Sequence, residues 1–417
     1  HKCDISSNTN SPAIMNWARD QIKSCRKDHS ICQPYFISEK SRKFLPTRVL
    51  GVGKDHDLSI RLLVTSELPP TSRATMSYIA LSHCWGKSHN VLLLQETFDG
   101  MKQSITVADL SANFRDAISI TRKLGVPYLW IDSLCIIQNS PGNKDWFKES
   151  QTMGLVYARA ICTISATASR DSEGGCFLNK ESFLGHCNLR EENDTSLVAT
   201  LSDLREDTVV AELFRQKVEP APLSTRGWTF QERILSSRIL HFCDGLVLFE
   251  CNTVQASSCH GDSESYPKKN HIRSDGKFQT PLGPTPPPRP PFPTLHLPEF
   301  RFADPLPSRN AVGKSYDSYK AYTSWTPQIP IVVDMSARLG IRGAFEVLIR
   351  FNAEGLEEKL EFHDCWYEIV ERYSIRDLTK ETDKLMAITG IAYFIAQNKD
   401  STFVAGLWVL TLQFNLL

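Results

Sequence analysis

The sequence predicts an α/β fold with a mainly parallel sheet and flanking helices. The first observation is the stretch 128–168, in which an apolar run, a polar turn, an amphipathic segment and a second apolar run follow one another. This order is typical of a β-α-β crossover. The second observation is that an apolar run at 78–86 and a helical pattern at 110–124 precede it. Strand and helix therefore alternate from 78 to 168, which indicates parallel strands covered by helices.

The composition is that of a folded protein without a strong charge. The chain has 417 residues, of which 41% are hydrophobic, enough for a large buried core and for more than one domain. Lys and Arg together number 47, as do Asp and Glu, so no net field attracts nucleic acid or an anionic membrane surface. No run approaches the ~18 consecutive apolar residues of a membrane-spanning helix. We expect no nucleic-acid partner and no membrane span.

The two ends of the sequence carry no export signal. The first ten residues, HKCDISSNTN, contain no basic start followed by an apolar segment. We therefore expect a cytoplasmic protein. The chain begins with His1 and ends in the apolar LWVLTLQFNLL, so we expect a fragment whose last element is cut off before its partner.

A helix and a hairpin are expected before the α/β alternation. In 13–32 the apolar residues recur along one face, which predicts a helix within an N-terminal helical preamble, 1–44. Two short β-type runs, 48–52 and 58–64, are separated by the turn-like GKDHD. This pattern is typical of a β-hairpin.

The alternation itself supplies the strands of the main domain, 45–250. Residues 128–137 are almost continuously apolar, as in a strand buried on both faces. Apolar residues then recur at helical spacing from 145, and β-branched residues from 161 indicate the next strand. Residues 179–221 are polar and weakly periodic, which is typical of a surface insertion.

The last part of the main domain is predicted to be a helix and a second hairpin. Residues 224–236 have a helical pattern, and two β-type runs follow across the turn at 243–245. From 251 to 309 we expect a disordered linker, because proline dominates 281–298 and cannot build a hydrogen-bonded ladder. Residues 310–417 are expected to be a helical C-terminal region.

Polar residues follow two of the predicted strands at the points where the strands end. They are Ser82, His83, Trp85 and Gly86 after the first strand and Asp132 and Ser133 within the next one. In open α/β sheets the carboxyl ends of the strands form the ligand crevice. We therefore expect these residues to bind a ligand. The alternative is structural: each side chain can cap a turn or satisfy loop backbone groups.

Trp228 and Glu232 form the second part of the candidate site. They are four residues apart, so on a helix they share a face. A carboxylate beside an indole is partly desolvated, which pushes its pKa upward and suits a general base or a ligand of sugar hydroxyl groups. We expect Glu232 at an exposed edge of the domain. The alternative is that Glu232 pairs with Arg226 or Arg233 and that Trp228 belongs to the core.

The cysteines predict no metal site. The chain has twelve, and none forms a Cys-x-x-Cys pair. The group Cys251, Cys259 and His260 matches no usual ligand spacing, so unligated thiols in a reducing compartment are expected. No GxGxxG, GxxxxGK[ST], HExxH or GxSxG motif is present, and His83 and Cys84 would point to opposite faces of a strand. ATPases of the Walker type, zincins, serine hydrolases and Cys-His proteases are not indicated.

Three blocks of the sequence resemble the fungal heterokaryon incompatibility (HET) domain. They are YIALSHCWG at 78–86, the segments YLWIDSLCIIQ, DWFKES and VYARAICTISA within 128–166, and RGWTFQERILSSRILHF at 226–242. The pieces DCWYEIVERYS and DKLMAITGIA are similar to the segment that often follows such a domain. The resemblance implies a fungal nonself-recognition protein whose domain triggers programmed cell death.

The resemblance also implies a fold and a chemistry. HET domains are similar to TIR domains, some of which cleave NAD with a glutamate in a W-x-x-x-E segment. This implies a TIR-like, flavodoxin-like sheet, NAD as the substrate rather than a bound cofactor, and Glu232 as the catalytic residue. The partner would be an incompatibility protein or a second copy of the chain. The alternative function is a non-catalytic signalling module that acts by self-association.

Overall fold

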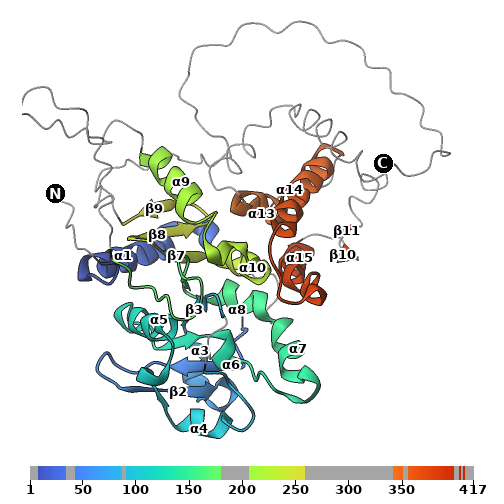
Figure 1. The fold of residues 1–417 in the computed structure, drawn as a ribbon. Helices are drawn as coiled ribbons and strands as arrows, with labels where there is room; N and C mark the ends of the chain where they lie inside the picture. The colour runs from blue at the N-terminus through green and yellow to red at the C-terminus, as the bar shows by residue number, and fades with distance from the viewer. Residues whose placement is uncertain are drawn as a thin grey trace, which may run out of the picture. The chain divides into compact units, whose positions relative to one another are not determined.

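The fold is described from a computed structural model (Figure 1). The described residues are 8–33, 43–86, 91–179, 206–258, 341–350, 356–398, 403–404 and 407–408. Residues 1–261 and 331–417 belong to one compact unit. The predicted linker lies outside the described residues except at 251–258, where the short strand Gln255–Ser257 forms.

A nine-stranded mixed sheet is the centre of the unit. Its strand order is β4-β2-β1-β5-β3-β6-β7-β8-β9. Three of the pairings between neighbours are parallel and five are antiparallel. The strands are β1 Arg48–Gly51, β2 Ser59–Val64, β3 Tyr78–Ser82, β4 Ile105–Thr106, β5 Tyr128–Trp130, β6 Thr163–Ser165, β7 Arg238–Cys243, β8 Leu246–Cys251 and β9 Gln255–Ser257.

The α/β class is confirmed, but the expectation of a mainly parallel sheet is not. Both predicted hairpins are present: β1 pairs with β2, and β7 pairs with β8 across a turn in which Gly245 has φ 75°. Each hairpin joins the sheet beside the parallel strands and adds antiparallel pairings there. The antiparallel majority therefore comes from the two hairpins and the short strands beyond them.

The parallel strands form the middle of the sheet, in the order β5-β3-β6-β7. Numbered along the chain, this order is 2-1-3-4. The connection from β3 leads to a neighbour on one side, and the connection from β5 crosses back to the other side of β3. The gap between the ends of β3 and β6 is therefore a topological switch point, where α/β sheets bind their ligands.

The predicted strand 128–137 is wrong beyond Trp130. Asp132 begins a short helix, α6 Asp132–Cys135, and its carboxylate accepts a 2.7 Å hydrogen bond from the backbone N–H of Ser133. The N–H of Cys135 donates to the carbonyl of Ile131 at 2.8 Å. The helical turn buries apolar side chains as a strand would, which explains why the apolar run alone was misleading.

Most of the expected helices are present. The first, α1, starts at Pro12, and the Ser11 side chain caps it by accepting from the N–H of Ile14 at 3.2 Å. The helix expected from 145 is divided into α7 and α8, and α9 lies in the stretch expected to be an irregular insertion. The bounds are α1 Pro12–Asp28, α3 Pro70–Ala74, α4 Phe98–Gln103, α5 Ala112–Lys123, α7 Lys144–Ser150, α8 Met153–Arg159, α9 Glu206–Lys217, α10 Gly227–Leu235, α13 Ile341–Arg350, α14 Leu356–Ser374 and α15 Met386–Asn398.

Helix α10 lies between two apolar cores. One core surrounds the sheet, and the other joins α13, α14 and α15 to α8 and α10. At the crossing of α8 and α15, a Cβ on Gly154 would lie 3.4 Å from the Cα of Gly390. A Cβ on Gly390 would lie 2.2 Å from Oε1 of Gln231 in α10. Glycine at these positions allows the three helices to approach closely.

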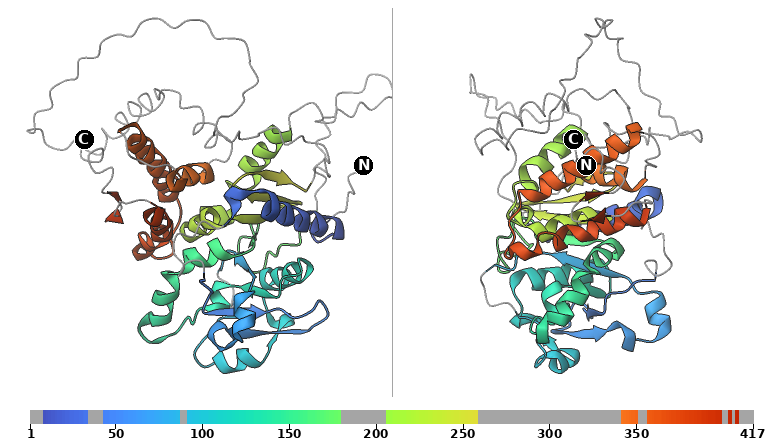
Figure 2. Two further views of the ribbon diagram at one scale, coloured as in Figure 1. Left: turned by 180° about the vertical axis from the view of Figure 1, so that it is seen from behind. Right: turned by 90° about the vertical axis from the view of Figure 1, so that its right-hand side faces the viewer.

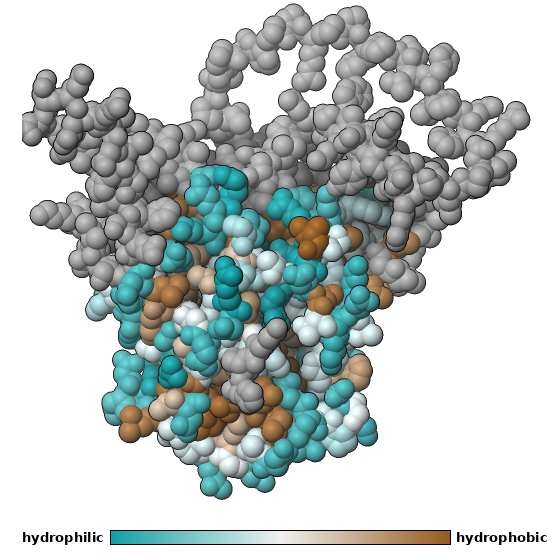
Figure 3. All heavy atoms as spheres, viewed as in Figure 1, coloured by the Kyte–Doolittle hydropathy of each residue, from teal (hydrophilic) through white to brown (hydrophobic). Residues whose placement is uncertain are grey.

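The surface and the edges of the sheet complete the description. Helix α1 contacts β8, and two further views show it beside that hairpin (Figure 2). On the face drawn in Figure 3, hydrophilic side chains are interspersed with smaller hydrophobic groups. No helix within the described ranges is long and apolar enough to cross a membrane.

Candidate functional site

The structure brings four of the predicted site residues together at the switch point. Ser82 ends β3, His83 follows it, Asp132 lies just after β5, and Glu232 comes from α10. Asp132 acts electrostatically on both His83 and Glu232, and Ser82 acts on Glu232 through a hydrogen bond. We call this group the switch-point cluster. It contains three titratable side chains and one hydroxyl group, from three separate segments of the chain.

Asp132 holds the two strand ends together. Its Oδ2 atom accepts a 2.8 Å hydrogen bond from Nε1 of Trp85, and its Oδ1 atom accepts from the N–H of Ser133. The same Oδ1 atom lies 3.9 Å from Nδ1 of His83. Helix α6 has Ile131 as its N-cap and no side-chain cap, so Asp132 contacts its own neighbour and two residues of the β3 end, and its role in binding stays a prediction.

His83 is a buried, uncharged histidine. It is 4% exposed, and its ring meets the ring of Phe114 edge-on with centroids 5.0 Å apart. Burial lowers the pKa of His83, because the charged imidazolium loses its water; Asp132 opposes this shift. Its Nε2 atom has no hydrogen-bond partner among the described residues. One ring nitrogen is thus available to a ligand or a water molecule.

Glu232 is the most perturbed carboxyl group of the cluster. Its pKa is raised to about 7, mainly by burial; hydrogen bonding with Ser82 and Tyr157 opposes this increase, and the charge of Asp132 contributes to it. Its Oε2 atom has no partner among the described residues. A carboxyl group of this kind is partly protonated and partly ionised near neutral pH, which suits acid and base chemistry.

The exposed position expected for Glu232 is wrong. The residue is 5% exposed, and the groups that act most strongly on its carboxyl come from β3, α6 and α8. Neither alternative pairing is the main interaction. Arg226 has only the weakest of the effects on the Glu232 carboxyl, and Arg233 instead binds Glu250 and Glu219.

Trp228 lies in the packing between the two cores. Its Nε1 atom donates to Oδ2 of Asp383 at 3.2 Å, and its ring meets Trp146 edge-on at 6.0 Å between centroids. It is partly buried against both apolar cores. These contacts match the core interpretation of Trp228, and its predicted role as a ligand-binding residue stays a prediction.

Gly86 and Ser133 are two further residues of the predicted site. Gly86 has φ 67°, and a Cβ there would lie 2.4 Å from the Cβ of Asp171. The loop after β3 therefore requires glycine. Ser133 is fully buried, and its Oγ atom has no partner among the described residues. Its role in binding stays a prediction.

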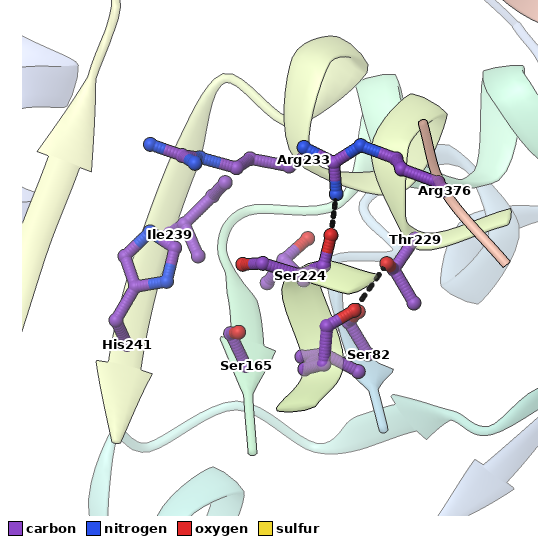
Figure 4. A pocket seen from close by; sticks show the side chains of 10 residues that line it. Ser82, Ser165, Ser224, Thr229, Arg233, Ile239, His241 and Arg376 are labelled. Carbon is purple, nitrogen blue, oxygen red and sulfur yellow. Dashed lines mark hydrogen bonds between the residues drawn. The ribbon is translucent and has the colours of Figure 1, made fainter. Parts of the chain in front are cut away.

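A small cavity adjoins the cluster (Figure 4). Its volume is about 20 Å³, room for a single water molecule. In the close-up, the two arginine side chains lie at the top and Ser82 and Ser165 at the bottom. The lining residues are Ser82, Thr163, Ser165, Leu223, Ser224, Thr229, Arg233, Ile239, His241 and Arg376.

An ion network borders this cavity, and two of its members, Arg233 and His241, line it. Glu250 accepts from Nε of Arg233 at 3.0 Å and contacts Nε2 of His241 at 2.9 Å, and Arg342 lies 4.0 Å away. Burial alone would raise the pKa of Glu250, but the two arginines and His241 hold it well below its usual range. The network joins α10, β7, β8 and α13, so it fixes the helix that carries Glu232.

Sequence reasoning missed Tyr157, which lies beside Glu232 and donates from its hydroxyl group to the carbonyl of Leu81 at 3.1 Å. It was one apolar position of a helical pattern, and nothing in the spacing distinguished it from its neighbours. Ser165 was also missed. Its place at the end of the next strand was the available signal, because small polar residues also end β3.

Comparisons with known proteins give one match. No curated protein and no solved structure matches the chain. The matching stretch begins at the first residue of β3 and ends at Glu232, so it contains the whole switch-point cluster. Residues 78–232 match the family model described as Heterokaryon incompatibility protein (HET).

Proposed function

We propose that this protein is a fungal nonself-recognition effector that triggers programmed cell death in heterokaryon incompatibility. The match of residues 78–232 to the HET family supports the incompatibility role. The cell-death role is proposed from the resemblance of the sequence to HET domains. Its partner would be an incompatibility protein or a second copy of this chain, in the cytoplasm.

The proposed chemistry is binding and cleavage of an NAD-type nucleotide at the switch-point cluster. One observation carries it: a buried carboxyl group with a pKa of about 7 and an unpartnered oxygen lies at the switch point of the sheet. The order 2-1-3-4 of the parallel strands is also that of flavodoxin-like sheets, which bind a nucleotide at this gap. This supports the TIR-like interpretation of the parallel strands.

Glu232 would act on the ribose next to the scissile bond. In hydrolysis of NAD, the bond from ribose C1′ to the nicotinamide nitrogen breaks, and the electron pair leaves with nicotinamide. A water oxygen then bonds to C1′ and gives up a proton. Positive charge develops on the ribose, and the ionised Glu232 carboxylate would stabilise it. Ser82 and His83 would orient the ribose or the attacking water.

The described conformation is closed to such a substrate. Glu232 is 5% exposed, and the adjoining cavity of about 20 Å³ cannot hold a dinucleotide. The proposal therefore requires α10 to move away from the end of β3 when the effector is activated. A latent effector of a lethal response needs such a closed resting state.

The burial of Glu232 also favours a second candidate function. If α10 never opens, the switch-point cluster is structural, and the domain is a non-catalytic signalling module that acts by self-association. The two functions differ in one measurable respect. The first consumes NAD and the second does not.

The test compares NAD turnover by three purified full-length proteins brought together on a multivalent scaffold. They are the wild type, Glu232→Gln and Glu149→Gln. Glu149 is a matched control, because it is a glutamate of equal burial on α7, outside the switch-point cluster. We expect a loss on the order of 10²-fold for Glu232→Gln alone, comparable to the loss of one transition-state hydrogen-bond donor. Equal turnover by wild type and Glu232→Gln would exclude Glu232 from the chemistry. A folded, assembled wild type without turnover would support the signalling module.

A further inference from the structure

Four potential metal ligands meet where the N-terminal helix contacts β8. Cys25 lies in the last turn of α1, His29 follows that helix, Cys32 ends the next 3-10 turn, and Cys251 ends β8. Their ligand atoms all lie within 4.8 Å of one another. The three cysteines are fully buried and form no disulfide. We call this group the Cys3His cluster.

The spacing of the ligand atoms is compatible with a tetrahedral zinc site, and one distance matches it closely. Tetrahedral zinc with Zn–S near ~2.3 Å and Zn–N near ~2.0 Å separates a sulfur from a nitrogen ligand by about 3.5 Å. The Sγ atom of Cys251 lies 3.5 Å from Nδ1 of His29. Cys25 and His29 are four residues apart at the helix end, so both face the same side. The local spacing is Cys-x3-His-x2-Cys, with the fourth ligand more than two hundred residues away.

Two backbone N–H groups are directed at the sulfur atom of Cys251. The backbone N–H groups of Thr253 and Val254 point at its Sγ atom, at 3.4 Å and 3.3 Å. Two backbone donors aimed at one sulfur are better matched to a negatively charged thiolate than to a neutral thiol. A thiolate is also the form of cysteine that binds zinc.

Arg238 gives an independent reason for negative charge at the cluster. Its side chain is buried, with the residue 4% exposed, and Nη1 lies 3.6 Å from Sγ of Cys25. Its other hydrogen bonds go to the carbonyls of Cys32 and Ile161, and no carboxylate pairs with it within the described residues. A buried arginine without an anion is costly. Three thiolates around Zn²⁺ carry one net negative charge, which would neutralise Arg238.

We propose that Cys25, His29, Cys32 and Cys251 bind a structural Zn²⁺ ion that fastens α1 to the β7-β8 hairpin. Sulfur and imidazole ligands in a tetrahedron select zinc over magnesium, calcium and manganese. Four protein ligands leave no open position, so the site is structural and not catalytic. Its existence is independent of NAD cleavage, since the cluster shares no residue with the switch-point cluster.

This proposal differs from the sequence-based expectation of no metal site. Of the group considered in the sequence, Cys251, Cys259 and His260, the last two lie outside the described ranges. The true neighbours of Cys251 are at the other end of the domain in sequence. No Cys-x-x-Cys pair is needed, because a helix end supplies Cys25 and His29 from the same face.

The first experiment measures the metal content of the full-length protein, purified with a reductant and desalted. Elemental analysis is expected to give about one zinc per chain for the wild type, as four-coordinate sites hold one ion. Cys25→Ala and Cys251→Ala are expected to lose nearly all of it. Cys135→Ala is the control, because Cys135 is equally buried but lies in α6, outside the cluster. A folded wild type without zinc, or zinc retained in both ligand variants, would refute the site.

A second measurement covers the case in which the ligand variants do not fold. Wild-type protein is alkylated at its thiols with and without prior removal of zinc by a chelator, and the modified cysteines are mapped by mass spectrometry. We expect Cys25, Cys32 and Cys251 to become reactive together when zinc is removed. The proposal is wrong if their reactivity is unchanged, or if two of them form a disulfide in protein purified with reductant. Cobalt in place of zinc should show sulfur-to-metal charge-transfer bands, which report thiolate ligands.

Discussion

Asp132 and Trp85 join the ends of two neighbouring parallel strands by a 2.8 Å hydrogen bond from the indole N–H to the carboxylate. Trp85 follows β3 and Asp132 follows β5, so this bond ties together the two loops from which the switch-point cluster is built. His83 precedes Trp85 by two residues, and its Nδ1 atom lies 3.9 Å from the same Asp132 carboxylate.

We predict that Asp132→Ala destabilises the domain by about 1–3 kcal/mol, because the N–H groups of Trp85 and Ser133 lose their acceptor. Urea denaturation followed by tryptophan fluorescence measures this change. Asp99→Ala is the control, since Asp99 is an exposed residue of α4. Equal midpoints for the two variants would show that the bond between Asp132 and Trp85 contributes no stability.

The stability of the wild type should depend on the ionisation of Glu232. Its pKa is raised from 4.5 to about 7 in the folded protein, so the folded state binds the proton more tightly than the unfolded state. This contribution is fully present below pH 4.5 and is lost as the pH rises to about 7. The loss is on the order of 3 kcal/mol.

Glu232→Gln should remove this pH dependence. Unfolding free energies of the two proteins are measured at pH 5 and pH 8, and their difference isolates Glu232 from His83 and other groups that titrate in the same range. We expect the unfolding free energy of the variant to increase relative to that of the wild type as the pH rises. Parallel profiles of the two proteins would mean that the Glu232 carboxyl group has an ordinary pKa.

Glu250→Gln should be among the most destabilising changes in the domain. It leaves Arg233 and Arg342 buried beside an uncharged amide, and removing one member of a buried ion network costs about 3–5 kcal/mol. Glu219 is the second carboxylate that pairs with Arg233, and the Glu219 side chain is 40% exposed. Glu219→Gln should therefore lower the free energy of unfolding by less than about 1 kcal/mol. Thermal melts of both variants test the contrast, and a reversed order would contradict the network.

Gly86→Ala and Gly100→Ala should act in opposite directions. Gly86 has φ 67°, and an added Cβ would collide with Asp171, so alanine is expected to cost at least about 1–3 kcal/mol. Gly100 lies in α4 with nothing within 4 Å of an added Cβ, so alanine should stabilise by about 0.5–1 kcal/mol. Chemical denaturation of the pair checks the sign of each effect. A stable Gly86→Ala protein would show that the loop after β3 can rearrange.

Local patterns predicted much of the sheet and several helices. The alternation from 78 to 168, both hairpins and α1 follow from residue spacing, turn residues and capping, which act over a few positions. The short helix at Asp132 was missed because a single carboxylate changed the local hydrogen bonding within an apolar run. A prediction from the average secondary-structure propensity of about ten residues does not detect the hydrogen bond of one side chain.

The site was predicted only in part, because its environment comes from distant segments. Ser82 and Asp132, at the ends of neighbouring parallel strands, both act on Glu232, which comes from helix α10. The surroundings of Glu232 include Ser82, Asp132 and Tyr157, which come from segments far earlier in the chain. The Cys3His cluster likewise depends on contacts between the two ends of the domain, which residue spacing alone does not contain.

Helix α10 carries Glu232 and also joins the sheet core to the C-terminal helices. A movement of α10 that exposes Glu232 must therefore change the packing of α15. The opening of the site and the rearrangement of α15 are thus energetically coupled. If the switch-point cluster binds a nucleotide as proposed, a protein that binds α13, α14 or α15 more tightly in the open form would raise the affinity for the nucleotide by some factor. Thermodynamic reciprocity then requires the nucleotide to raise the affinity for that protein by the same factor.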